Sequence, residues 1–381
     1  MKPPTWFSVR AMLVTAGTIA LLASSCAQVT PGASLAPGAS ASGDSPAPSR
    51  SSSAVHIVAI AARDEKQAWA MSDRVLLTTS DGGANWSVLK RVNVAGGRAL
   101  LFVNGGLIVA GIGGASDLDV FVRVSQDSGV NWTETILPTT GQPGDVRLAA
   151  GKDLVAIEVV QTTSANASIA DVYVSVKGGE FARHKLPAAG SLTVLGAEEL
   201  WLAGGVLSDE LWMSADAGES WTKVGLPADL GGELGIGPPI ELGGAMVLPV
   251  TINGAETRED LFRSDDGGSS WQAIASLAIG GDTGQGVTAP NAVAGDRLVV
   301  LGSRGGLFSS TNDGSTEAFA PQGLPAGDTV LQFVSATAGW ARVIERGCLD
   351  GKSNCYADTR MFTTGDAGQT WVESRLATDT P

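Results

Sequence analysis

The chain has 381 residues, a formal net charge of −14 and 50 glycines. A surface this acidic is repelled by nucleic acid and by anionic lipid headgroups, so neither is an expected partner. Glycine is costly inside a helix, and its abundance therefore favours a turn-rich β protein over a helical one.

The first 25 residues have the pattern of an export signal. Lys2 and Arg10 precede a mostly apolar run of 12 residues, Ala11–Leu22, which is too short to span a bilayer. Small residues then lead to Cys26. This arrangement resembles the lipobox of bacterial lipoproteins, in which the cysteine is lipidated and becomes the new N-terminus. We expect Cys26 to be the only membrane attachment; an ordinary secretory signal cleaved nearby is the alternative.

Residues 26–54 are predicted to form a disordered tether. After the cysteine they are nearly all Ala, Ser, Pro and Gly, and they bury too little apolar surface to fold. A flexible chain of this length spans roughly 30 Å from end to end. We therefore expect a signal peptide at 1–25, a tether at 26–54 and a folded domain at 55–381. The domain would lie outside the cytoplasm, anchored to the bacterial cell membrane.

A motif of the form Ser/Thr-x-Asp-x-Gly-x-x-Trp recurs along the remaining chain. Two further copies are decayed, with Lys177 and Asn312 at the position of the acid. The seven acid positions are spaced 39 to 54 residues apart. Regular spacing of a four-position motif indicates a repeat architecture. The five full copies have as their acid and indole Asp81 and Trp86, Asp127 and Trp132, Asp216 and Trp221, Asp266 and Trp271, and Asp366 and Trp371.

Each repeat reads as four short strands. The apolar residues alternate with a period of two, and the units are rich in glycine, which disfavours helical repeats. Several units end in Leu-Pro, and proline ends a strand because it cannot donate to the ladder. Four strands per unit of this length are typical of a propeller blade. The sequence therefore predicts an all-β, seven-bladed β-propeller with four-stranded antiparallel blades. Whether residues 55–62 begin the first blade or complete the last one is left open.

The repeats resemble the Asp-box, or BNR, motif of sialidases, sortilin-type receptors and photosystem II assembly factors. The resemblance covers essentially the whole folded domain and is specific for fold rather than function. It implies that each box joins the third and fourth strands of its blade. It also implies that the hydroxyl and carboxylate bond to amides of their own turn, while the indole packs under the blade.

The boxes are interpreted as structural rather than as calcium sites. A calcium loop needs alternating acids and a distal glutamate, and none of the seven boxes has them. The chain contains two histidines, so a histidine-rich metal centre is excluded. We expect no metal and no other cofactor.

Candidate binding residues occur in the longer connections between second and third strands, on the face opposite the boxes. Long connections on a rigid scaffold are where binding usually resides. The alternative is that they are solvated loop tips. The candidates are Asp117, Asp119, Asp171, Glu256, Arg258, Glu259, Asp260, Arg346, Asp350 and Arg360.

Cys348 and Cys355 are predicted to form a local disulfide, because the export signal implies an oxidising compartment. A bridge closing so short a loop contributes about 2–3 kcal/mol in the chain-entropy model. We expect it to shape the connection in the seventh blade rather than to hold the fold.

The sequence is compatible with two functions. The first is a non-catalytic binding or assembly scaffold, expected to be a monomer, that binds a protein or glycan at the cell surface through the loops opposite the Asp boxes. Photosystem II assembly factors of this type present a basic patch, whereas this chain is strongly acidic. The second is a glycoside hydrolase of the sialidase type, which needs three arginines, a Tyr–Glu pair, an acid/base Asp and an Arg-Ile-Pro element. The last is absent, and the only tyrosines are Tyr173 and Tyr356. The scaffold is therefore preferred.

Overall fold

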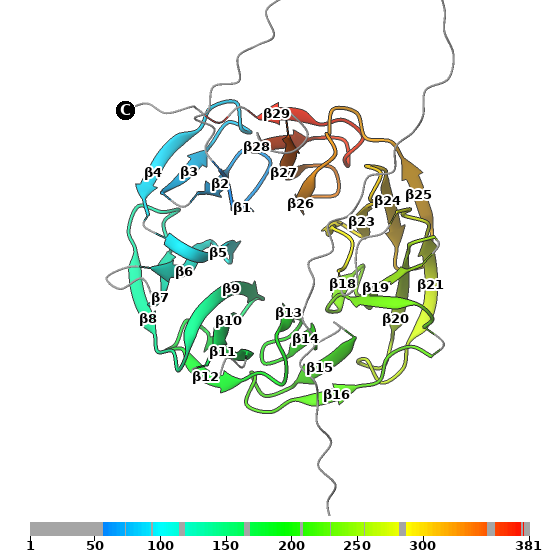
Figure 1. The fold of residues 1–381 in the computed structure, drawn as a ribbon, viewed down its shortest axis with the longest axis horizontal. Helices are drawn as coiled ribbons and strands as arrows, with labels where there is room; N and C mark the ends of the chain where they lie inside the picture. The colour runs from blue at the N-terminus through cyan, green and yellow to red at the C-terminus, as the bar shows by residue number, and fades with distance from the viewer. Residues whose placement is uncertain are drawn as a thin grey trace, which may run out of the picture. The chain divides into compact units, whose positions relative to one another are not determined.

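The computed structural model describes residues 56–376, apart from residues 73, 93, 114–118, 164–167, 206–208, 229, 255, 282–286, 349–354 and 375. The described residues form strands and turns, and they include no helix long and apolar enough to cross a membrane. The strands make seven antiparallel sheets arranged as the blades of a propeller (Figure 1). The predicted signal peptide, Cys26 and the tether lie outside the described residues.

Each blade is built from consecutive strands. Blade 1 contains β1 (Ala59–Ala62), β2 (Ala68–Met71), β3 (Val75–Thr79) and β4 (Ser87–Arg91); blade 2 contains β5 (Val94–Val103), β6 (Gly106–Gly113), β7 (Val120–Ser125) and β8 (Thr133–Leu137). Blade 3 contains β9 (Gln142–Ala150), β10 (Leu154–Thr162), β11 (Ser168–Val176) and β12 (Ala182–Lys185); blade 4 contains β13 (Gly190–Val194), β14 (Leu200–Gly204), β15 (Glu210–Ser214) and β16 (Thr222–Val224).

The remaining three blades follow the same order. Blade 5 contains β17 (Glu233–Ile236), β18 (Ile240–Leu242), β19 (Ala245–Asn253), β20 (Arg258–Ser264) and β21 (Gln272–Leu277). Blade 6 contains β22 (Asn291–Ala294), β23 (Arg297–Leu301), β24 (Leu307–Thr311) and β25 (Thr316–Phe319); blade 7 contains β26 (Asp328–Phe333), β27 (Gly339–Cys348), β28 (Cys355–Thr364) and β29 (Val372–Ser374). The predicted seven-bladed fold is confirmed.

Blade 5 has an interrupted inner strand. Strands β17 and β18 both pair with β19, one along Val250–Asn253 and the other along Ala245–Val247. Between them the chain reads Gly237, Pro238, Pro239. Because proline has no N–H to give to a ladder, the two prolines break one inner strand into two.

The ring closes without a strand shared between its first and last blades. Strand β1 pairs with β2, so the N-terminal strand belongs to blade 1. Across the joint with blade 7, Ala62 N donates to Gln332 Oε1 at 3.0 Å. Trp86 Nε1 donates to Ser374 Oγ at 2.8 Å, and that hydroxyl donates to Gly83 O at 2.7 Å. The N-terminal strand thus begins the first blade, which the sequence left open, and hydrogen bonds of side chains join that blade to the last one.

The hydrophobic core is divided among the joints between neighbouring blades. Seven buried clusters are present, and each combines apolar residues of two adjacent sheets. Both faces of an inner strand are covered in this way, and every residue of β6 is buried. Trp69, Trp201 and Trp340, which recur in second strands, are fully buried. Blade-to-blade packing of this kind is the main source of stability.

The Asp-box turns share one hydrogen-bond pattern. In the first box Thr79 Oγ1 donates to Asp81 Oδ1 at 2.9 Å and accepts from Gly83 N at 3.0 Å, while Asn85 N donates to the same carboxylate at 2.9 Å. The other four full boxes repeat these bonds. In the third full box, hydrogen bonds from Ser220 lower the pKa of Asp216 to about 2. The carboxylates are thus used as acceptors within their own turns.

The box indoles reach the preceding blade. Trp86 packs edge-on against Trp340 of blade 7, with ring centroids 6.0 Å apart. Trp271 of blade 5 meets Trp201 of blade 4 in the same way, at 6.4 Å. Each of these two boxes therefore closes a hairpin and also seals the joint between two blades.

Candidate functional site

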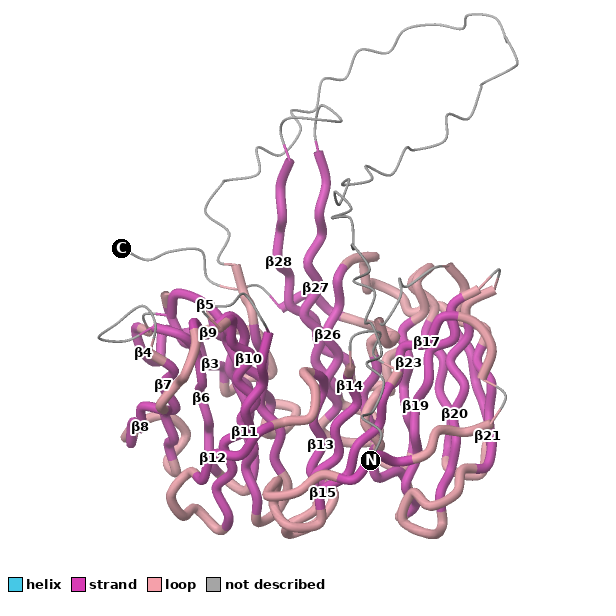
Figure 2. Tube along the Cα trace, turned by 60° about the horizontal axis from the view of Figure 1, so that its bottom comes forward, coloured by secondary structure: helices cyan, strands magenta, loops and turns pink. Residues whose placement is uncertain are grey.

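Strands β27 and β28 form a ribbon that projects from one face of the ring (Figure 2). This is the face of the connections between second and third strands, opposite the Asp boxes. Strand β26 accompanies β27 only as far as Ile344, and β29 pairs with β28 only from Met361 onward. Within the described residues, the outer part of the ribbon has no neighbouring strand on either edge. Its backbone register places Cys348 opposite Cys355; the thiols themselves lie outside what is described.

Charged side chains line the base of the ribbon. Arg360 Nη1 bonds to Glu345 Oε1 at 2.9 Å, and its Nη2 bonds to Glu373 Oε2 at 2.5 Å. The hydrogen bond with Glu373 contributes most to a raised pKa of this guanidinium. Arg346 is 69 % exposed and lies 3.7 Å from Asp328, so its charge remains in solvent. The base of the ribbon is fixed, and its outer arginine is available to a partner.

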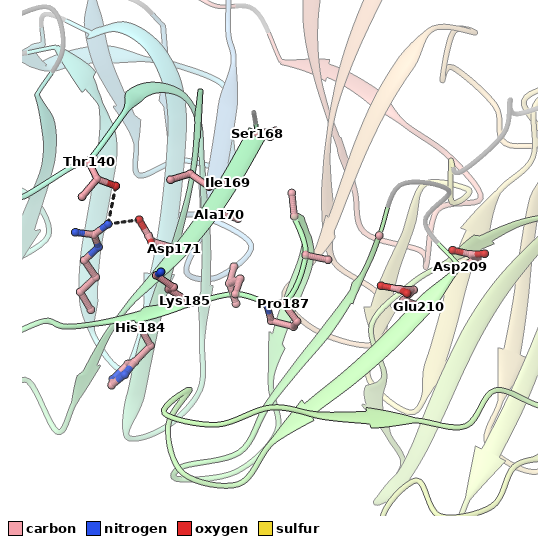
Figure 3. Close-up of a pocket in the computed structure, with 15 residues that line it drawn as sticks. Thr140, Ser168, Ile169, Ala170, Asp171, His184, Lys185, Pro187, Asp209 and Glu210 are labelled. Carbon is pink, nitrogen blue, oxygen red and sulfur yellow. Dashed lines mark hydrogen bonds and ion pairs between the residues drawn. The ribbon is translucent and has the colours of Figure 1, made fainter. Parts of the chain in front are cut away.

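A buried polar network lies at the outer end of blade 3. Asp171 Oδ2 accepts from Gln161 Nε2 and from Arg183 Nη2, each at 2.6 Å. Arg183 Nη2 also donates to Thr140 Oγ1 at 2.9 Å (Figure 3). Asp171 is almost fully buried. Its carboxylate is compensated by these donors, so it organises the connection between blades 2 and 3.

A depression of about 1070 Å³ borders this network, between blades 3 and 4. His184, Lys185, Asp209 and Glu210 line it together with the backbone after β12 (Figure 3). Glu210 accepts from Lys223 Nζ at 2.7 Å, and this bond lowers the pKa of its carboxyl. Glu210 is therefore ionised at neutral pH and unsuited to act as a general acid. The depression presents both signs of charge, as in a polar contact surface.

Two glutamates are buried within blades. Glu259 in β20 is 0 % exposed; its Oε2 accepts from Thr251 Oγ1 at 2.5 Å, and no partner is described for its Oε1. Burial raises the pKa of this carboxyl to about 8. In β10, Glu158 accepts from Gly190 N at 2.9 Å and pairs with Arg147 at 3.3 Å, and burial raises its pKa to about 7.

Glu158 was not among the sequence candidates. Its only sequence signal is a single acid within the apolar stretch "LVAIEVVQT" of β10. A buried carboxyl group destabilises the fold unless it is paired or protonated, so a single acid in an apolar strand indicates a compensating partner or a raised pKa. The nearest carboxylate on the strand before it is Asp145, which raises the pKa of Glu158 and is itself bonded to Arg147.

Several candidates expected in loops lie in strands instead. That placement was wrong because the strands flanking the connections run further than the sequence pattern indicates; the residues concerned are Asp171, Arg258, Glu259, Asp260, Arg346 and Arg360. Asp119 directly precedes β7, and Glu256 is an exposed turn residue before β20. Asp117 and Asp350 lie outside the described residues. The candidates come from blades 2, 3, 5 and 7 and form separate groups rather than one constellation.

The one tyrosine whose side chain the structure describes is not placed to act as the nucleophile that a sialidase needs. Tyr173 lies in the third strand of blade 3, is buried, and donates its hydroxyl hydrogen to the carbonyl of Pro138. The side chain of Tyr356 lies outside what is described. Among the described residues, no group of three or more His, Cys, Asp or Glu side chains is placed to hold a metal ion.

No protein-family model matches the chain. It is 30 % identical over 211 residues to a xyloglucanase of Paenibacillus sp., a match that covers 51 % of this chain and 19 % of that protein. The chain thus spans about a fifth of the length of this relative. YCF48 from Cyanidioschyzon merolae has a similar structure, with a TM-score of 0.50, 15 % identity, and coverage of 82 % of this chain and 96 % of that one.

A Trypanosoma rangeli sialidase is more distant, with a TM-score of 0.43, 12 % identity, and coverage of 73 % and 56 % of the two chains. Fold and repeats together define a seven-bladed β-propeller of the BNR type. At these identities the structural likeness establishes the fold alone.

Proposed function

We propose that this protein is an extracytoplasmic lipoprotein that binds a protein partner through the β27–β28 ribbon. One observation carries the proposal: the ribbon extends beyond both strands that flank it, within the described residues. A strand edge without a neighbour is a template on which another chain can pair its backbone. The exposed Arg346 adds a charge that would select an acidic or polar partner segment.

The membrane anchor is proposed from the sequence. Cys26 would carry the lipid, and residues 27–54 would hold the propeller away from the bilayer by roughly 30 Å. We expect Cys26→Ser to move the protein from the membrane fraction to the soluble extracytoplasmic fraction, because the diacylated cysteine is its only attachment. Immunoblots of fractionated cells measure this. Retention of the variant in the membrane fraction would mean that a different attachment exists.

The ribbon makes a separate prediction. A photo-crosslinking amino acid in place of Arg346, in otherwise intact protein in living cells, is expected to give one discrete heavier product on irradiation. The same residue in place of Val88, which is 59 % exposed on the outer wall of blade 1, serves as the matched control. Binding through the ribbon requires the product from position 346 alone. No product there, or the same product from both positions, contradicts the proposal.

A glycoside hydrolase is the second candidate, favoured by the identity of 30 % with a xyloglucanase over 211 residues. Glycosidases use two carboxyl groups facing each other across the scissile bond, one of them with a raised pKa. Glu158 and Glu259 have raised pKa values but are fully buried in different blades, where a sugar does not reach them. Hydrolysis of xyloglucan by the purified protein would favour this second function over the scaffold.

A further inference from the structure

The joints between blades are normally sealed by a box indole. Trp86 and Trp271 pack on tryptophans of the preceding blades. Trp132 of blade 2 lies beneath Lys90 of blade 1, with Nζ 5.5 Å from the ring centroid. The turn before Trp132 is also closely packed against blade 1, because a Cβ on Gly129 would lie less than 3 Å from the Leu89 side chain. A sealed joint therefore holds a flat ring against the outer strand of the blade before it.

The box of blade 3 lacks that ring. It has Lys177 at the position of the acid, is one residue short, and ends in Phe181 rather than tryptophan. In the shortened turn Lys177 takes a positive φ of 51°, the conformation that Ala217 and Ala367 have directly after the acid in two full boxes, so the turn has no carboxylate where the full boxes have theirs. Phe181 packs on the cluster between blades 2 and 3, but it is smaller than an indole. The joint between blades 2 and 3 therefore receives a smaller ring from its box than the joints that the five full boxes seal.

A depression of about 1160 Å³ opens at this joint, on the Asp-box face. Ile136 on the outer strand of blade 2 lines it and is 48 % exposed. On the outer strand of blade 1 the corresponding surface is covered, because Leu89 packs against the box of blade 2. Ile136, Phe181 and the half-buried Trp132 supply apolar surface within the depression. An apolar floor left uncovered in this way favours a ligand that takes the place of the missing ring.

The rim of the depression is polar and nearly balanced in charge. Lys152 and Lys177 oppose Asp153 and Glu180. Asp127 also borders the depression, but its carboxylate accepts from the backbone and side chain of Asn131. A balanced rim does not select a charged ligand. Its amide, ammonium and carboxylate groups instead suit a ligand with many hydroxyl groups, which donate and accept alike.

We propose that the joint between blades 2 and 3 is a binding site for a neutral oligosaccharide. A pyranose ring has one flat C–H face that can lie against Ile136 and the two aromatic side chains, and a rim of hydroxyls that can meet the polar groups around them. The site lies on the face opposite the ribbon and does not depend on the proposed protein partner. The decay of one Asp box converts a sealed joint into this site.

Titration calorimetry of the full-length protein, in a detergent without a sugar headgroup, tests the proposal. The probes are cellohexaose, chitohexaose and the xyloglucan heptasaccharide. We expect at least one to bind with a dissociation constant of about 1 mM or tighter. Ile136→Glu is expected to weaken that affinity at least tenfold, whereas Val88→Glu, at a somewhat more exposed position on blade 1, leaves it unchanged. Both positions are exposed, so both variants are expected to melt at the wild-type temperature.

A second variant restores the missing ring. Phe181→Trp is expected to fill part of the depression and to weaken oligosaccharide binding without lowering the melting temperature. Absence of binding by all three probes overturns the proposal. Equal losses in the two glutamate variants, or wild-type affinity in Phe181→Trp, overturn it as well, because the ligand would then lie elsewhere.

Discussion

Gly268→Ala is expected to lower the free energy of unfolding by about 3 kcal/mol, from a steric overlap added to a backbone cost. Gly268 has a φ of +85°, and a Cβ there would lie less than 3 Å from the buried ring of Trp201 in the preceding blade. A buried indole between two blades cannot move aside without displacing its other neighbours. Equilibrium unfolding in urea measures the change.

The adjacent residue provides the control. Gly267 has a φ of +68°, but a Cβ there would meet nothing within 4 Å. Gly267→Ala therefore pays only the cost of a left-handed conformation, about 1 kcal/mol. Equal losses from the two variants would show that backbone conformation, rather than the joint between blades, requires glycine in this turn.

Glu259→Gln is expected to remove a pH-dependent loss of stability. Burial raises the pKa of Glu259 to about 8 in the folded protein, from an ordinary value of 4.5. Between these two values the folded chain keeps a proton that the unfolded chain releases, so the stability of the wild-type protein falls as the pH rises through this window. The loss is on the order of 3–5 kcal/mol by pH 8. An uncharged amide has no such proton, so the free energy of unfolding of the variant rises relative to that of the wild type as the pH rises.

Unfolding by urea at a series of pH values from 5 to 9 measures the difference. Glu256→Gln, at an exposed turn three residues earlier, is the control and is expected to follow the wild-type curve. Glu158, whose pKa of about 7 is also raised by burial, acts in the same direction and is present in all three proteins. If the wild type and Glu259→Gln lose stability in parallel, Glu259 is ionised in the folded state.

The fold was predictable because one motif recurs with four positions intact. Because the motif repeats, the number of blades and the order of strands within each blade follow from the sequence without a separate prediction for each strand. The phase of the ring was not readable, since either choice of first strand satisfies the same repeat. It is decided by the pairing of β1 with β2, which places the N-terminal strand in blade 1, while Ala62 bonds across the joint to Gln332, 270 positions away.

The candidate site was less predictable, because strand ends depend on neighbouring strands. Arg360 looks like part of a long loop, yet β28 begins at Cys355 and carries it in a ladder. Glu158 was missed because a strand covered on both faces has no polar side on which an acid would stand out. The open joint at Phe181 was visible as a decayed box, but its consequence depends on Ile136 of the preceding blade.

Closure by side chains alone has a consequence for how the chain assembles. Every sheet forms from one unbroken stretch of sequence, so each can take shape as its segment becomes available, with mostly local pairing. The joint between blades 1 and 7 is different. It includes the hydrogen bond from Trp86 to Ser374, 288 positions apart, so it can form only after blade 7 has been made. Until blade 7 has formed, the polypeptide would therefore be an open arc in which blade 1 has one uncovered face. Because that face exposes apolar residues that the closed ring buries, we expect a chaperone to bind there, or aggregation to begin there, rather than at a loop of the closed ring.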